Sequence, residues 1–104
     1  MAINILTPAK DAGYSDEIIV GKDEQIVIAL YTSNGSDCPN GVALRLQHRD
    51  INGNYMTVAT PGYGPVFLGK NCQQILLTTP GTYRVYRPGS NHESDVGVGV
   101  QQGL

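Results

Sequence analysis

The chain of 104 residues has 7 lysines and arginines against 9 aspartates and glutamates, which gives a formal net charge of −2. This charge supplies no basic field for nucleic acid or an anionic membrane, and no apolar run approaches the roughly 20 residues that span a bilayer. We therefore expect one domain, of the usual size of about 100–150 residues, that binds neither nucleic acid nor a membrane.

The first 15 residues carry no pattern that assigns them to a strand. A helical stretch over residues 8–15 is interrupted by Gly13, so we interpret it as a loop. The start of the chain also lacks the basic region and the long apolar segment of a signal peptide. These features predict synthesis in the cytosol.

Strand signals recur at short intervals through the remainder, residues 16–104. The expected strands cover residues 17–20, 25–32, 42–49, 55–60, 66–68, 73–79, 82–88 and 96–100. Short strands separated by Gly- and Pro-containing turns are typical of an antiparallel β-sandwich, Ig-like or jelly-roll-like, or of a barrel. We expect a single antiparallel β-sandwich domain of about seven or eight strands.

Three of these strands have a clear pattern of faces. In residues 42–49 the apolar side chains alternate with polar ones, and Asn52-Gly53 predicts a type I′ hairpin turn to residues 55–60. In the strand after Pro80-Gly81, Tyr83, Val85 and Arg87 share one face, which leaves Arg84 and Tyr86 as the outward pair. The last strand, "VGVGV", has a flat glycine face that serves either close backbone packing or a partner.

The sequence offers few candidates for catalysis or metal binding. Cys38 and Cys72 form no CxxC motif, so we expect two buried, reduced thiols and no zinc site.

His48 lies on the apolar face of its strand, where we expect a structural role. His92, Glu93 and Asp95 could ligate a metal, but their Pro-Gly-Ser flank favours a solvated loop. "DINGN" (residues 50–54) lacks the glycine position and downstream Glu of a calcium loop, so the hairpin is preferred. We therefore expect no enzyme and no cofactor.

Surface recognition is better supported, because the chain has six tyrosines against one phenylalanine and no tryptophan. Tyrosine combines a large ring with a polar tip and is enriched at interfaces. "PGYGP" would display Tyr63 on a stiff loop, where contact with a protein neighbour is favoured over a sugar. The alternative is that Tyr63 lies against its own domain.

The last third of the chain resembles a pattern of small virion proteins of tailed bacteriophages. The segment is "LLTTPGTYRVYRPGSNHESDVGVGV" (residues 76–100), in which a Pro-Gly-Thr-Tyr-Arg-Val strand and a short loop precede a final Val-Gly-Val strand. The hairpin "LQHRDINGNYMTVAT" (residues 46–60) is similar to a segment of the same β-sandwich domains. Together the two segments cover 40 of the 104 residues.

This resemblance implies a non-enzymatic virion protein, best matched by a capsid decoration (cement) protein, made in the host cytoplasm. It implies the major capsid protein or another virion protein as partner, and a homo-oligomer, dimer or trimer. Residues 1–15 would then be an N-terminal arm that adds a strand to a neighbour. The partner-binding residues we expect are Ile3, Ile5, Leu6, Tyr63, Arg84 and Tyr86. The alternatives are a carbohydrate- or receptor-binding module of a phage fibre or head–tail structure, and a metal protein or enzyme built on His92, Glu93 and Asp95.

Overall fold

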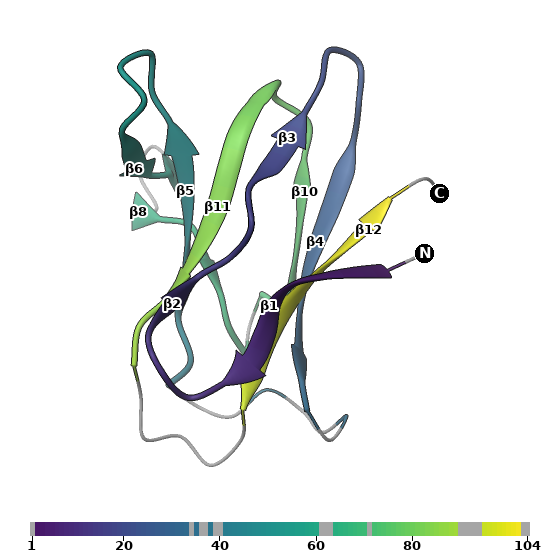
Figure 1. Cartoon of the computed structure of the whole chain (residues 1–104), viewed down its shortest axis with the longest axis vertical. Coiled ribbons are helices and arrows are strands. Elements are labelled where there is room, and N and C mark those ends of the chain that lie inside the picture. The colour runs from purple at the N-terminus through teal and green to yellow at the C-terminus, as the bar shows by residue number, and fades with distance from the viewer. Residues whose placement is uncertain are drawn as a thin grey trace.

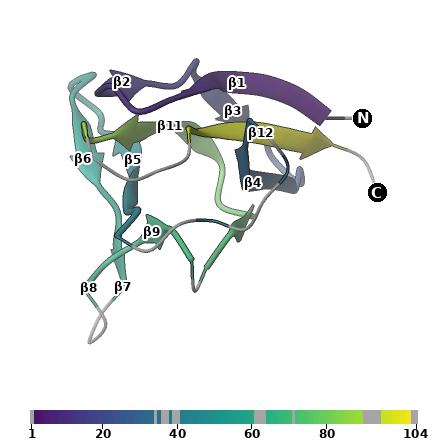
Figure 2. The same ribbon diagram turned by 90° about the horizontal axis from the view of Figure 1, so that it is seen from below.

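The computed structural model describes residues 2–33, 35, 38, 41–60, 64–70, 72–89 and 95–102. The regular structure of this part of the chain is entirely β (Figure 1). Sheet A is formed, in spatial order, by β1 (Ala2–Ala9), β12 (Val96–Gln102), β4 (Ile26–Thr32) and β10 (Gln74–Leu77). Sheet B is formed by β2 (Gly13–Tyr14), β11 (Gly81–Arg87), β5 (Leu44–Arg49) and β6 (Tyr55–Thr57), with β3 (Ile18–Val20) paired to β11 and β9 (Phe67–Leu68) to β5. A third pair, β7 (Ala59–Thr60) and β8 (Gly64–Pro65), projects from these two layers (Figure 2).

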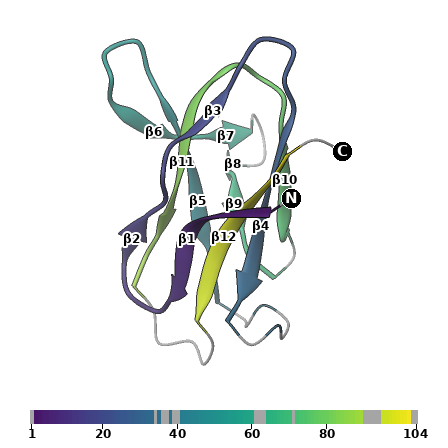
Figure 3. The ribbon, with the colours of Figure 1, turned by 45° about the vertical axis from the view of Figure 1, so that its right-hand side comes forward.

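The expected antiparallel β-sandwich is confirmed, and its strand order is that of a jelly roll. Every pairing among the described strands is antiparallel. The chain passes from one sheet to the other at most connections: β1 lies in sheet A, β2 and β3 in B, β4 in A, β5 in B, β10 in A, β11 in B and β12 in A (Figure 3). This alternation winds the two sheets around one core. Among the described residues no helix is long and apolar enough to cross a membrane.

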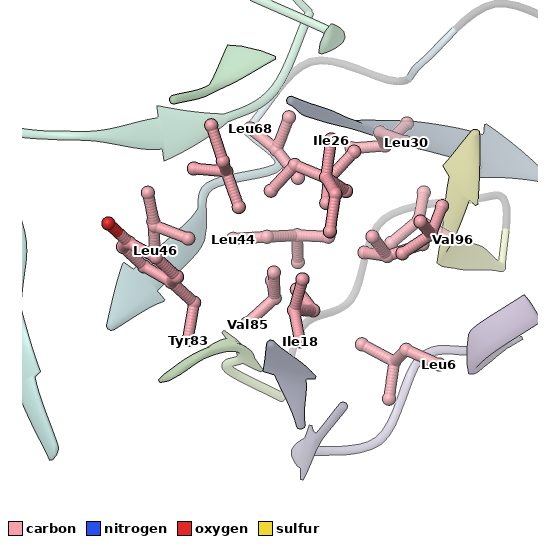
Figure 4. Close-up of a cluster of buried hydrophobic side chains, with 14 of the residues drawn as sticks. Leu6, Ile18, Ile26, Leu30, Leu44, Leu46, Leu68, Tyr83, Val85 and Val96 are labelled. Carbon is pink, nitrogen blue, oxygen red and sulfur yellow. The ribbon is translucent and has the colours of Figure 1, made fainter. Parts of the chain in front are cut away.

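The core lies between the sheets and is built by period-two alternation (Figure 4). Sheet A contributes side chains from β4 and β12, and sheet B contributes side chains from β3, β5 and β11. The buried apolar residues include Ile18, Val20, Ile26, Ile28, Leu30, Leu44, Leu46, Leu68, Leu77, Tyr83, Val85, Val96, Val98 and Val100. Each fully buried aliphatic side chain stabilises the fold by roughly 1.5–3 kcal/mol.

The N-terminal segment that we expected as a separate arm is part of the sandwich. Residues 2–9 form β1, which pairs with β12, and Leu6 is only 7% exposed in the core. Asp16 donates its backbone N–H to the carbonyl of Ile5 at 2.8 Å, so the segment is also joined to the chain that follows. The register of β1 shifts between Asn4 and Leu6 and again between Leu6 and Ala9. These irregularities remove the alternation by which a strand is recognised in a sequence.

The glycine face of β12 serves close backbone packing. A Cβ atom on Gly97 would lie 2.4 Å from the carbonyl oxygen of Leu6 and 2.8 Å from the nitrogen of Pro8, so only glycine lets β1 approach this closely. Tyr31 lies beside Gly99, and its hydroxyl donates a hydrogen bond of 2.7 Å to Asn4 Oδ1 on β1. Of the two roles expected for this face, the structure shows the packing role.

The predicted hairpin between β5 and β6 is confirmed, but its turn is not type I′. The N–H of Gly53 donates to the carbonyl of Asp50 at 3.1 Å, and Gly53 has a φ of 84°, whereas Asn52 has no positive φ. This is a type I turn followed by a left-handed glycine. Asp50 Oδ1 favours it by accepting N–H groups from Asn52 and Asn54 at 2.9 Å each. An Asx-type side chain therefore decides the turn.

Of the two cysteines that we expected to be buried, only one is buried. Cys38 is 2% exposed within the core, and Cys72 lies at the surface.

Candidate functional site

The outer face of sheet B carries a compact cluster that we call the tyrosine–arginine face. It consists of Tyr14, Gln47, Tyr55, Arg84 and Tyr86. Side chains on successive residues of a strand point to opposite faces, so burial of Tyr83 and Val85 turns Arg84 and Tyr86 outward.

Strand register brings the cluster together from four strands. Tyr86 on β11 is paired with Tyr14 on β2, and their ring centroids are 4.9 Å apart with the planes tilted by 39°. On the other side of β11, Arg84 is paired with Gln47 on β5. The neighbouring hairpin strand β6 then supplies Tyr55. The face thus depends on the fold and not on one sequence motif.

Arg84 is the centre of the face. Its guanidinium carbon lies 3.9 Å from the centroid of the Tyr14 ring and 4.0 Å from that of the Tyr55 ring, and its Nε donates a 2.7 Å hydrogen bond to Gln47 Oε1. The quadrupole of an aromatic ring attracts a cation that lies over the ring face. Two stacking contacts and one hydrogen bond hold a normally flexible side chain in one orientation.

Glu17 supports this arrangement from the edge of the sheet. The Tyr55 hydroxyl donates a short hydrogen bond to Glu17 Oε2, and this bond, followed by desolvation and the negative charge of Glu17, raises the pKa of Tyr55. Arg49 Nη1 lies 3.9 Å from the same oxygen, but both side chains are about half exposed. Such an ion pair adds little stability. The hydrogen bond from the Tyr55 hydroxyl to Glu17 is the contact that fixes the far end of the Tyr55 ring.

Arg87 shares β11 with Arg84 but points inward, as the alternation predicts, and is only 5% exposed. It donates from Nε to the carbonyl of Asp11 at 2.6 Å, and from Nη1 to the carbonyls of Thr7 and Val96 at 2.8 Å each. Burial lowers the pKa of Arg87, and the negative charges of Asp11 and Asp95 oppose that shift. The side chain is a structural strut that connects β11 with β1 and β12.

The structure separates the expected partner-binding residues. Arg84 and Tyr86 lie half-buried on the outer face of sheet B. Ile3 is 48% exposed on edge strand β1 of the other sheet, Ile5 is half-buried against the core, and Leu6 belongs to the core. Leu6 therefore cannot reach a partner while the domain is folded. Tyr63, His92 and Glu93 lie outside the described residues.

Sequence reasoning missed three members of the face, Tyr14, Gln47 and Tyr55. Tyr14 lies in the segment interpreted as a loop, and no local pattern links it to Tyr86. Tyr55 had a usable signal, because it opens the return strand of the hairpin and lies opposite Arg49, on the outward side of β5.

Other candidate chemistry is sparse. The His48 ring stacks on Tyr83 with centroids 4.6 Å apart, beneath Gly81, which agrees with a structural role. Asp50 holds the hairpin turn through its carboxylate. In the part of the chain that the structure describes, no group of three or more His, Cys, Asp or Glu residues is placed to hold a metal ion.

Comparison with known proteins gives a fold but no family. The sequence matches no protein-family model and no curated protein. Among solved structures, the SPBc2 prophage-derived protein YomS is similar over 97% of this chain and 92% of its own, with a TM-score of 0.57 and 11% identity. A protein from Sulfurospirillum deleyianum matches over 99% of this chain and 96% of its own, with a TM-score of 0.49 and 10% identity. At 11% identity, the likeness to YomS is one of fold alone.

Proposed function

We propose that this chain is a non-enzymatic structural component of a phage particle and that it stabilises the capsid lattice as a decoration protein. The observation that carries the proposal is the tyrosine–arginine face, in which contacts within the chain already hold Arg84. The likeness in fold to the prophage-derived YomS supports a phage origin. The resemblance of residues 46–60 and 76–100 to virion β-sandwiches points the same way.

The composition of the face suits a protein interface. Tyrosine and arginine carry much of the binding energy in such interfaces, above all where they are already held in place. Apolar surface extends the same side of sheet B, because Ile19 opposite Thr82 is 68% exposed and Phe67 opposite Arg45 is 37% exposed. A standard interface buries about 800 Å² on each partner.

The same geometry disfavours the carbohydrate-binding alternative. Sugars stack on open aromatic faces, whereas Arg84 occupies one face of Tyr14 and one face of Tyr55. Tyr86 packs beside Tyr14 as well. A protein surface can contact the edges and hydroxyls of these rings without displacing Arg84.

Binding to particles tests the proposal. Particles of the phage that encodes the chain, prepared without it, are mixed with the purified protein and sedimented. We expect saturation at a fixed copy number and a rise in the temperature at which the particles break. Tyr14→Ser should weaken binding, while the matched variant Tyr31→Ser, on the outer face of sheet A, should not. Absence of co-sedimentation at saturating protein would reject the proposal.

A further inference from the structure

We propose that Arg84 is a receptor for a carboxylate, and that its ligand is an acidic side chain, Asp or Glu, of the partner protein. The inference deepens the proposed function by naming the chemistry at the centre of the contact. It rests on that function only for the identity of the partner. The receptor itself follows from the geometry of the face.

The first step is the orientation of the guanidinium. Its central carbon lies over the Tyr14 ring and over the Tyr55 ring, and its Nε is bound to Gln47. Within the described part of the chain, both Nη nitrogens remain without a hydrogen-bond partner. The free edge of Arg84 is therefore a fixed two-pronged donor. A carboxylate accepts two parallel N–H···O bonds from such a fork.

The second step is the charge of the surroundings. Three of the four arginines in the chain, Arg45, Arg49 and Arg84, lie on the outer side of sheet B, although the chain has a net charge of −2. Glu17 is engaged with Tyr55 and Arg49. The face therefore attracts an acidic partner, and the buried sides of the fork strengthen the attraction.

The third step decides between anions. A phosphoryl group carries close to two charges and is usually bound by a cluster of arginines. Here the aromatic rings hold only one guanidinium, because Arg49 is paired with Glu17 and the described contacts of Arg84 include neither Arg45 nor Arg49. One planar cation between two rings suits a singly charged, planar carboxylate. Partner side chains can present such a group while their backbone contacts the surrounding tyrosines.

The test uses the full-length, ¹⁵N-labelled protein and two small probes. Acetyl-Gly-Glu-Gly-amide carries the carboxylate, and acetyl-Gly-Gln-Gly-amide is its neutral match. We expect saturable NMR shifts of the Arg84 Nε–H signal with the Glu peptide alone. Arg84→Lys, which keeps the charge but not the fork, should weaken binding by about tenfold or more. Arg45→Lys on the same face is the matched control and should leave the affinity within about twofold, as expected for a rim charge.

Several results would overturn the inference. Equal shifts with both peptides, or an unchanged affinity in Arg84→Lys, would show that the Arg84 guanidinium does not bind a carboxylate selectively. Tighter binding of inorganic phosphate or of glucuronate at Arg84 would replace the acidic protein side chain with another ligand. Dimerisation that is lost in Arg84→Lys would assign the fork to a second copy of the chain.

Particle binding separates this inference from the proposed function. If the protein does not bind particles but binds the Glu peptide through Arg84, the proposed function fails and the carboxylate-binding role of Arg84 is supported. If particles bind Arg84→Lys as tightly as the unaltered protein, the receptor has no role in that contact and the inference fails. Backbone NMR spectra of each variant confirm that it is folded.

Discussion

Arg87 Nη1 and the carbonyl oxygen of Thr7 are joined by a hydrogen bond of 2.8 Å that links the end of β11 to β1. The same nitrogen also reaches Val96 on β12. One buried cation thus connects the two sheets and holds the N-terminal strand in its own domain. Because its charge is buried, the side chain is stabilising only while all of its carbonyl partners stay in place.

Arg87→Met should therefore destabilise the domain strongly. The variant removes donors from the carbonyls of Thr7, Asp11 and Val96, and we expect a loss of about 3 kcal/mol or more in the free energy of unfolding. Urea unfolding followed by circular dichroism measures it. Arg45→Met on the exposed side of β5 is the control and should cost less than about 0.5 kcal/mol. Equal losses of unfolding free energy in the two variants would contradict the role of Arg87 in connecting β11 with β1 and β12.

Removal of residues 1–9 should unfold the domain or leave it prone to aggregation. The truncation removes β1, takes Leu6 from the core and exposes the edge of β12. Unpaired edges promote association between chains. Circular dichroism and size-exclusion chromatography measure the result. A truncated chain that folds with an unchanged unfolding midpoint would restore the arm that the sequence suggested.

Gly97→Ala should be far more costly than Gly99→Ala. At position 97 the added methyl group would lie 2.4 Å from backbone, whereas the nearest atom at position 99 is 3.6 Å away. We expect a loss of about 1–3 kcal/mol for Gly97→Ala, because β1 must move, and little change for Gly99→Ala. Thermal unfolding of both variants makes the comparison. Similar melting temperatures would mean that β1 does not pack on β12 as closely as described.

Tyr83 should make the stability fall at alkaline pH. Its hydroxyl donates a 2.7 Å hydrogen bond to the carbonyl of Thr79, and burial raises its pKa. The folded chain therefore holds this proton more tightly than the unfolded chain. The resulting stabilisation is fully present below the unfolded pKa of about 10 and is lost as pH rises through the folded pKa.

Tyr83→Phe tests this dependence. Below pH 9 the variant should lose about 1 kcal/mol, the value of one hydrogen bond, and above pH 10 its stability should fall less steeply than that of the unaltered protein. Urea unfolding between pH 8 and pH 11 supplies the data. Parallel curves would assign the alkaline loss to another group.

The sequence predicted the parts of the fold that depend on local alternation. The period-two pattern of β11 places Val85 inward and Arg84 outward. The period-two pattern of β5 and the turn signal after it predict the β5–β6 hairpin. Strand β1 was missed because its register shifts hide the alternation, and the hairpin turn was misassigned because the carboxylate of Asp50 outweighs the preference of Asn52-Gly53. The register of β1 is set by pairing with the distant β12, which local sequence does not report, whereas the Asp50 side chain is a local signal that the Asn52-Gly53 preference concealed.

The candidate site was predictable in part for a similar reason. Arg84 and Tyr86 share a strand, so their common face can be read from spacing. Tyr14 joins them across a separation of about 70 residues, and that proximity exists only after β2 pairs with β11. A preformed cation between two rings is therefore a property of the sandwich and not of a motif.

The most direct test of the binding face compares two exposed tyrosines in the particle. Tyr14 is 55% exposed on the outer side of sheet B, and Tyr31 is 38% exposed on the outer side of sheet A. Covalent footprinting of tyrosine side chains, read by mass spectrometry, is performed on the free protein and on the protein bound to particles. Our account predicts that binding protects Tyr14 and leaves Tyr31 reactive. Protection of Tyr31 with unchanged reactivity of Tyr14 would contradict it.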